Sequence, residues 1–220
     1  MNIGLFPLSI VLFPNSFYNL HIFEERYKKL IKDSLKNESY FGINYVHNTK
    51  MYDVGCTAVV HKIIKEYEDG KYDIIVKGVE RYYLEKFIEG DRTYYTGDVK
   101  TFDDGNEYVD ANLAIESIEQ FNEMISNIKI ASIGTIPMSC ASDKYLSFLI
   151  AQKAGFTGLQ KQELLEMTSE TKRLLFIKNH LKNILPNLKK ADQIDRVIMN
   201  DGYFTGDQLK WLVAETLFLS

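Results

Sequence analysis

The residue types best suited to catalysis or metal binding are the histidines and cysteines, and their spacing favours neither chemistry. The four histidines are His21, His47, His61 and His180. None stands four residues from another, the spacing that brings two ligands to one helix face. Cys56 and Cys140 form no Cys-x-x-Cys pair and are expected to be reduced thiols. We therefore expect no catalytic residue, no metal site and no cofactor, and we expect His21, which lies in an apolar run, to be a buried imidazole.

Motifs that hold phosphates or activate a nucleophile are missing from the sequence. The only Gly-Lys pair is Gly70-Lys71, with Lys65 where a phosphate-binding loop needs its first glycine and Tyr72 where it needs a hydroxyl residue. No Gly-x-Ser-x-Gly or His-Glu-x-x-His motif occurs. The expectation is a protein that is not an enzyme.

The overall charge makes nucleic acid a weak candidate partner. The formal net charge is −4, so the surface repels phosphate on average. The apolar content of 45 % is ordinary for a globular protein, and no apolar run reaches the roughly 20 residues that span a bilayer. The N-terminus has no basic segment typical of a signal peptide. We expect a cytoplasmic protein without membrane contact.

The first half of the chain has mainly the pattern of strands, rich in Val, Ile, Tyr and Phe. The predicted strands are Leu5–Leu12, Phe17–Phe23, Tyr40–Val46, Thr57–Tyr67, Tyr72–Val79, Arg81–Phe87 and Tyr94–Phe102. One helix is predicted over Glu24–Asn37, where Tyr27, Leu30, Ile31 and Leu35 share a face. Asp69-Gly70 predicts a hairpin with a type I′ turn, and Gly78 predicts a bulge or a close backbone approach.

After Gly105 the apolar residues recur at the spacing of helices. Helices are predicted from Tyr108 to Ile128, from Asp143 to Ala154 and from Gln160 to Met167. A further helix is predicted to end before Pro186, and two more to lie in the tail. The sequence thus predicts an α+β protein with a β-rich part, residues 1–104, and an α-helical part, residues 105–220.

Several motifs, taken in order, resemble the N-terminal substrate-binding domain of Lon proteases. They are Phe6-Pro7-Leu8 with Val11–Pro14 and Leu20–Tyr27, then Phe41-Gly42, Tyr52–Ala58, Asp69–Tyr72 with Val76–Tyr82, and Lys161–Glu166 with Arg173-Leu174. The resemblance extends over about Leu5 to Leu185, and residues 188–220 match nothing in it. It implies a PUA-like β pseudo-barrel followed by a helical bundle.

The same resemblance implies binding of polypeptides. Neither an ATPase nor a peptidase segment follows, so we expect a free-standing recognition domain. Expected partners are unfolded or specific polypeptides, with a protease or chaperone system as a further candidate. The alternative is a PUA-like module that binds nucleic acid. Arg26 and Arg81 are expected to hold carboxylates or chain ends, because a planar guanidinium does this well.

Candidate contact residues come from aromatic pairs and from the polar face of the first helix. Tyr82-Tyr83 and Tyr94-Tyr95 are adjacent in strands, so one member of each pair points away from the core. The alternative for these aromatics is that the helical part covers them, and for the charged helix face that it is simply solvated. The predicted protein-binding surface comprises Phe17, Tyr18, Glu25, Lys28, Lys29, Tyr83 and Tyr95.

Overall fold

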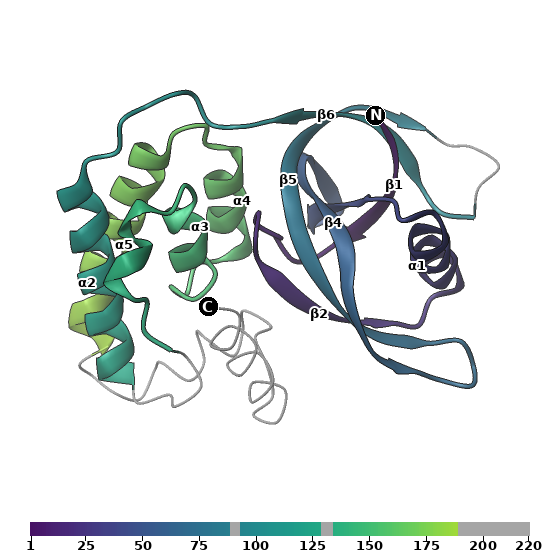
Figure 1. The fold of residues 1–220 in the computed structure, drawn as a ribbon, viewed down its shortest axis with the longest axis horizontal. Coiled ribbons are helices and arrows are strands. Elements are labelled where there is room, and N and C mark those ends of the chain that lie inside the picture. Colours follow the sequence, from purple (N-terminus) through teal and green to yellow (C-terminus); the bar gives the residue numbers. More distant parts are fainter. Residues whose placement is uncertain (89–92, 129–133, 189–220) are drawn as a thin grey trace. The chain divides into compact units, whose positions relative to one another are not determined.

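The computed structural model describes residues 1–88, 93–128 and 134–188 and divides the chain into two compact units (Figure 1). The first unit is Met1–Asp104 together with Gly158–Thr168. The second contains the described residues of Gly105–Thr157 and Ser169–Ser220. Strands lie in the first unit and helices dominate the second, so the predicted α+β class is confirmed.

The first unit is built on a six-stranded sheet that closes on itself. Its strands are β1 (Asn2–Leu8), β2 (Phe17–Ile22), β3 (Phe41–His47), β4 (Lys50–Glu66), β5 (Tyr72–Ile88) and β6 (Thr96–Phe102). The order is β2-β5-β4-β3-β1-β6, and an additional pairing of β5 with β6 completes a ring of five strands. Among the strand pairs of the described residues, only β1 with β3 is parallel. Strand β2 lies outside the ring, on the first half of β5.

Strand β5 changes its neighbour near Gly78. Residues Tyr72–Lys77 pair with β2, whereas Arg81–Ile88 pair with β6. Between them the Gly78 N–H donates to the carbonyl of Ser16 at 2.8 Å, and the Asn15 N–H donates to the Gly78 carbonyl at 2.9 Å. A Cβ atom on Gly78 would collide with the backbone of Phe13. The close approach predicted at Gly78 is therefore confirmed.

The hairpin between β4 and β5 is confirmed, but its turn differs from the prediction. The Tyr67 N–H donates to the Lys71 carbonyl and the Gly70 N–H donates to the Tyr67 carbonyl, both at 2.9 Å. Gly70 has a φ of 77°, whereas Asp69 is not among the residues with positive φ. A type I′ turn needs positive φ at both central residues, so the turn is instead a longer loop with Gly70 in the left-handed region.

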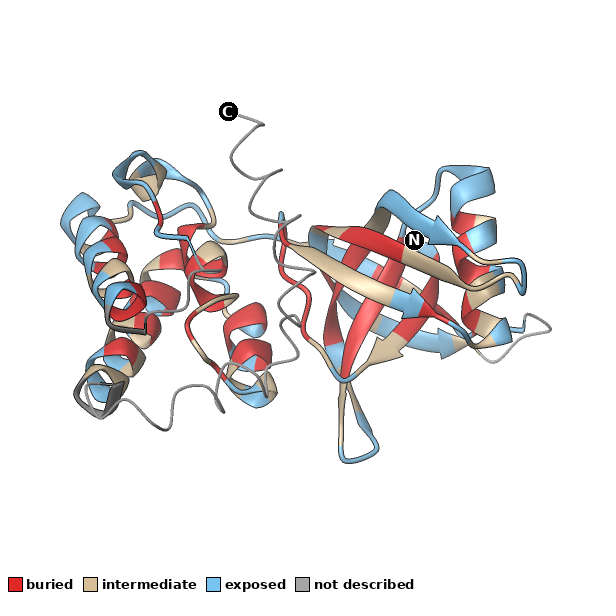
Figure 2. Cartoon of the chain, turned by 90° about the horizontal axis from the view of Figure 1, so that it is seen from below, coloured by how far each residue is buried: buried red, intermediate tan, exposed pale blue. Residues whose placement is uncertain are grey.

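Helix α1 (Glu25–Asn37) completes the core of the first unit. It buries Tyr27, Leu30 and Ile31, which pack in one cluster with Phe6 and Phe41. Figure 2 shows buried residues along the strands and on one side of α1. The apolar face was predicted from helical spacing, but Leu35, expected on that face, is 40 % exposed.

Helix α4 (Gly158–Glu166) belongs to the first unit, although the sequence prediction places this segment in the helical part. Buried Arg81 connects it to the sheet. Its Nη1 donates to the carbonyls of Leu165 at 3.2 Å and Met167 at 2.5 Å, and its Nη2 donates to Asp104 at 2.5 Å. Arg81 thus holds a carboxylate, as expected, together with carbonyls at the C-terminal end of α4.

The second unit is helical. Its elements are α2 (Ala111–Ile128), the short 3-10 helix η1 (Met138–Ser142), α3 (Leu146–Ala151) and α5 (Glu170–Leu188). A buried network fixes α3 against α5, because Glu170 accepts hydrogen bonds from Ser147 and Arg173. The prediction that this last helix ends before Pro186 is wrong, since α5 runs to Leu188. A proline in the last turn of a helix removes one backbone hydrogen bond. The helix can continue through it, because few backbone hydrogen bonds form in that turn.

The helices predicted in the tail lie outside the described residues. Among the helices of the described part of the chain, none is both long and apolar enough to cross a membrane.

Candidate functional site: the outer face of a β arm

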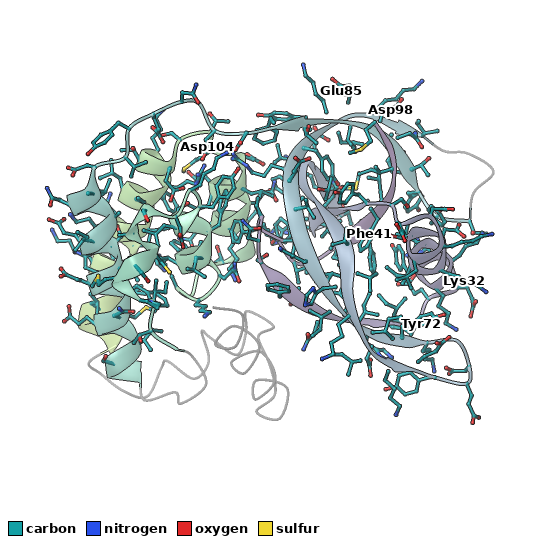
Figure 3. All side chains as sticks on the ribbon, viewed as in Figure 1. Lys32, Phe41, Tyr72, Glu85, Asp98 and Asp104 are labelled. Carbon is teal, nitrogen blue, oxygen red and sulfur yellow. The ribbon has the colours of Figure 1, made fainter. Side chains whose placement is uncertain are left out.

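Three strands of the first unit form an arm with one face on the core and one face away from it. The arm consists of β2, residues Tyr72–Lys77 of β5 and residues Val59–Glu66 of β4. Ile74 and Val76 are fully buried, and Tyr18, Leu20 and Val60 pack on the same core cluster. Because side chains alternate along a strand, the residues between them lie on the opposite face. Figure 3 shows side chains projecting from the arm around Tyr72.

The strand register arranges this opposite face in three rows. Each row runs from β2 across β5 to β4. The first row is Phe17, Lys77 and Val59, the second is Asn19, Ile75 and Lys62, and the third is His21, Asp73 and Lys65. His61 and Tyr67 contact these rows, as described below. We call this set the arm face. Its members are Phe17, Asn19, His21, Val59, His61, Lys62, Lys65, Tyr67, Asp73, Ile75 and Lys77.

One end of the arm face is aromatic and cationic. The rings of Phe17 and His61 meet edge to face with centroids 4.9 Å apart, and Lys77 Nζ lies 5.9 Å from the Phe17 centroid. Phe17 is half-buried and His61 is exposed. Between the two ends, Ile75 is only 7 % exposed although it points away from the main core. The neighbouring side chains of the arm face therefore cover Ile75, an apolar residue between its two ends.

The other end holds a hydrogen-bonded carboxylate. His21 Nδ1 lies 2.6 Å from Asp73 Oδ1, and the Tyr67 hydroxyl donates to Asp73 Oδ2 at 2.6 Å. The hydrogen bond to Asp73 raises the pKa of Tyr67. Partial burial works to raise the pKa of Asp73, but the hydrogen bonds from Tyr67 and His21 outweigh it and lower that pKa. Lys65 Nζ lies 4.3 Å from the Tyr67 ring centroid.

The charge on the arm face is positive. Asp73 is the only acidic member of the set, and His21 and Tyr67 already occupy its oxygens. The set also contains three lysines, namely Lys62, Lys65 and Lys77. Their long stems and the neighbouring rings combine apolar contact with positive charge, which suits a partner that is both apolar and acidic.

Only one residue of the predicted binding surface lies on this face. Phe17 does, whereas Tyr18 packs on the core from the other face. Lys28 Nζ donates to Glu25 at 2.8 Å and to the carbonyl of Asp69 at 2.8 Å, so it ties α1 to the hairpin turn. Lys29 forms an ion pair with Asp33 at 3.4 Å.

The two remaining predicted residues lie elsewhere, Tyr83 in the second half of β5 and Tyr95 just before β6. Tyr83 is 42 % exposed and stacks on Phe102, while its neighbour Tyr82 is buried. Tyr95 is 39 % exposed and lies against Phe87 with ring centroids 5.1 Å apart. In β5 the pair Tyr82-Tyr83 has one member inside and one outside, as strand alternation predicts. Tyr94 is buried and Tyr95 is exposed, but both precede β6, so the prediction that this pair lies in a strand is wrong.

Sequence reasoning missed most of the arm face. The expectation that His21 is a core imidazole is wrong, because its side chain is half exposed and pairs with a carboxylate instead of a backbone group. No contact role is predicted from the sequence for His61, Lys62, Lys65, Tyr67 and Lys77. A usable signal was the run from Val59 to Lys65, which has three basic residues, four β-branched ones and no acid.

Among the residues that the structure describes, no group of three His, Cys, Asp or Glu side chains could hold a metal ion. Cys56 is fully buried, and burial raises its pKa to about 12, which keeps the thiol protonated and unreactive.

Comparisons with known proteins agree on one family. The family model of the ATP-dependent protease La (LON) substrate-binding domain matches residues 2–183. The fold is similar to a Lon N-terminal domain protein from Xanthomonas campestris, with a TM-score of 0.64 and 19 % identity over 80 % of this chain and 96 % of the other. It is also similar to the N-terminal domain of Mycobacterium avium complex Lon protease, with a TM-score of 0.62 and 15 % identity over 83 % and 99 % of the two chains.

The comparison with curated proteins gives no match. The family model covers most of the chain, and both solved structures share the fold along nearly their whole length. The chain belongs to the family of the Lon substrate-binding domain.

Proposed function

We propose that the protein binds polypeptide segments, without catalysis, through the arm face of its first unit. The family match supports polypeptide as the partner class. The observation that carries the proposal is the position of Phe17, which is on the side of β2 turned away from the core and in contact with His61 and Lys77. Neither this aromatic contact nor the exposure of His61 is needed to fill the core.

Half-exposed aromatic rings beside lysine stems are efficient contact groups. Such residues lose little conformational freedom on binding and remove apolar surface from water. The rigid three-stranded base of the arm holds them in place, because hydrogen bonds run from β2 through β5 to β4. A flexible, unfolded segment could therefore lie across the rows without rearranging the face.

The test measures binding of a fluorescently labelled unfolded polypeptide, reduced and carbamidomethylated α-lactalbumin, to the whole chain. Native α-lactalbumin is the reference. Phe17→Ala is expected to weaken binding about fivefold to tenfold, which corresponds to about 1 to 1.4 kcal/mol for loss of one aromatic contact. Tyr83→Ala and Tyr95→Ala remove exposed aromatic side chains away from the arm face and test the other exposed aromatics of the sequence-predicted surface.

Two results would count against the proposal. Equal retention of native and unfolded α-lactalbumin would show that no unfolded segment is recognised. Weakening by Tyr83→Ala or Tyr95→Ala, with Phe17→Ala unchanged, would move the contact away from the arm face. Cooperative thermal unfolding of each of the three variants, well above the assay temperature, would confirm that each remains folded.

A further inference from the structure

The far half of β4 has a free edge. Pairing of β4 with β3 ends where Phe41 lies beside Ala58, whereas pairing with β5 continues to Glu66. From Val59 to Glu66, no strand of the described residues pairs with the other side of β4. Residues 61–66 are all exposed, and Ile63 and Ile64 are 41 % and 54 % exposed. Unpaired backbone donors and acceptors at such an edge can bind another strand.

The charge of this edge argues against a second copy of the chain as the occupant. The segment from Val59 to Lys65 carries His61, Lys62 and Lys65 and no acidic residue, in a chain with a net charge of −4. Two such edges brought together would place lysines against lysines, and like charges on neighbouring strands are destabilising. The same lysines favour a strand that carries carboxylates. The edge can therefore exclude a second copy of the chain and still accept an acidic strand.

Two bulges set the spacing that the partner must match. Lys62 and Lys65 lie beside Ile75 and Asp73 of β5, with irregularities between Val60 and Lys62 and between Ile63 and Lys65. Ile75 and Asp73 are two residues apart, so the two lysines, although three apart in sequence, are a two-residue strand step apart. That step is roughly 6.8 Å. A regular strand on the free side presents residues i and i+2 at the same interval.

The residue between those two positions points to the opposite side of the sheet. On that side β4 presents Ile63, whose register partner is the buried Ile74. An apolar residue at position i+1 would cover part of the exposed Ile63 side chain. The edge is therefore complementary to a short pattern of acidic, apolar and acidic residues.

We propose that the protein selects extended polypeptide segments of the form Asp/Glu–apolar–Asp/Glu and binds them as an added strand on the free edge of β4. The inference rests on the proposed function, because it names the class of segment that the arm binds. Backbone hydrogen bonds and the contact with Ile63 supply the attraction, and Lys62 and Lys65 supply the selection. Exposed ion pairs contribute little affinity alone, so the lysines act chiefly by excluding other sequences.

The experiment compares labelled ten-residue peptides with the whole chain at low salt. One peptide has Glu-Val-Glu at its centre, a second has Lys-Val-Lys, and a third is the acidic peptide with alternate backbone amides N-methylated. The unchanged protein is expected to bind the acidic peptide about tenfold more tightly than the basic one. It is expected to bind the N-methylated acidic peptide at least about tenfold more weakly than the unmethylated acidic peptide, because the added strand loses its backbone donors. Lys62→Glu with Lys65→Glu is expected to reverse the preference.

The matched control is Lys100→Glu with Lys172→Glu, which changes the charge equally at exposed sites off the arm. It is expected to keep the preference for the acidic peptide. Thermal unfolding of both double variants checks that the fold is retained.

The outcomes separate this inference from the proposed function. If unfolded α-lactalbumin binds but the Lys62→Glu, Lys65→Glu variant shows the same peptide preference as the unchanged protein, the inference is overturned and the proposed function stands. If no polypeptide binds at all, the proposed function is contradicted, and with it the inference that rests on it. If single-stranded oligouridine binds more tightly than any peptide and the double variant abolishes that binding, the edge serves nucleic acid and the inference is wrong.

Discussion

The Nδ1 atom of His21 lies 2.6 Å from Oδ1 of Asp73, on the side of the sheet that faces away from the core. The two residues are direct neighbours across β2 and β5, and the Tyr67 hydroxyl reaches the second oxygen of the same carboxylate. One carboxylate thus joins β2, β5 and the residue that follows β4. This arrangement fixes the polar end of the arm face.

Replacement of Asp73 is expected to loosen that end in a pH-dependent way. The pKa of Asp73 is lowered in the folded protein, so its contribution to stability is present above the ordinary value of 3.8 and is lost as pH falls through the lower folded value. Asp73→Asn is therefore expected to lower the melting temperature by about 2 °C at pH 6, since a partly exposed pair contributes little. Melting curves of both proteins from pH 6 down to pH 3 should converge at the acid end. A difference that grows as pH falls would contradict the assignment.

Phe17 and Tyr18 offer a matched pair of substitutions, because adjacent residues of β2 face opposite ways. Tyr18→Ala removes a side chain packed on the core cluster and is expected to cost about 2 kcal/mol of unfolding free energy. Phe17→Ala is expected to cost less than about 1 kcal/mol while weakening polypeptide binding. Urea unfolding measures the first effect and the binding assay the second. Equal destabilisation by both would show that Phe17 also belongs to the core.

Arg81 is expected to be essential for the stability of the first unit. It is 1 % exposed and is the buried cation that Asp104 and the carbonyls of Leu165 and Met167 share. Arg81→Met removes the charge that faces that carboxylate and the hydrogen bonds to both carbonyls, which is expected to cost about 3 to 5 kcal/mol. Urea unfolding measures this cost. Asp104→Asn, which keeps the oxygen acceptor, should cost clearly less, and a mild effect of Arg81→Met would contradict the role assigned to it.

The two cysteines are expected to differ in reactivity. Burial raises the pKa of Cys56 to about 12, and the side chain has no exposed surface. Burial and the nearby Asp143 also raise the pKa of Cys140, but this residue is half-buried. Titration of the native protein with Ellman's reagent at pH 8 should therefore modify Cys140 slowly and spare Cys56 until the protein unfolds. Cys140→Ser is the control, and rapid reaction of that variant would contradict the burial of Cys56.

Local patterns predicted the elements well where one signal dominated. The helix expected over Glu24–Asn37 is α1 (Glu25–Asn37), because its apolar residues recur at helical spacing. The hairpin around Gly70 is likewise present. In contrast, Thr49 has a φ of 70° in the turn between β3 and β4, and a β-branched residue gives no sequence signal for that conformation.

The arm face could not be predicted from the sequence, because it depends on pairing between strands that are distant along the chain. Alternation along β2 separates Phe17, Asn19 and His21 from Tyr18 and Leu20, but both sets contain aromatic or apolar residues, so period alone does not say which set is inside. The bulges that keep Lys62 and Lys65 on one face appear only in the register of β4 with β5. The continuity of β5 through Gly78 and the association of α4 with the sheet also come from long-range contacts.

Hydrogen–deuterium exchange of the whole chain, with and without saturating unfolded α-lactalbumin, tests the central claim most directly. Binding at the arm predicts slower exchange of backbone amides in Phe17–Ile22 and Val59–Glu66, with little change in α2 and α5. Protection confined to α2 and α5, or no protection anywhere despite measured binding, would contradict the assignment of the arm as the site that receives polypeptide.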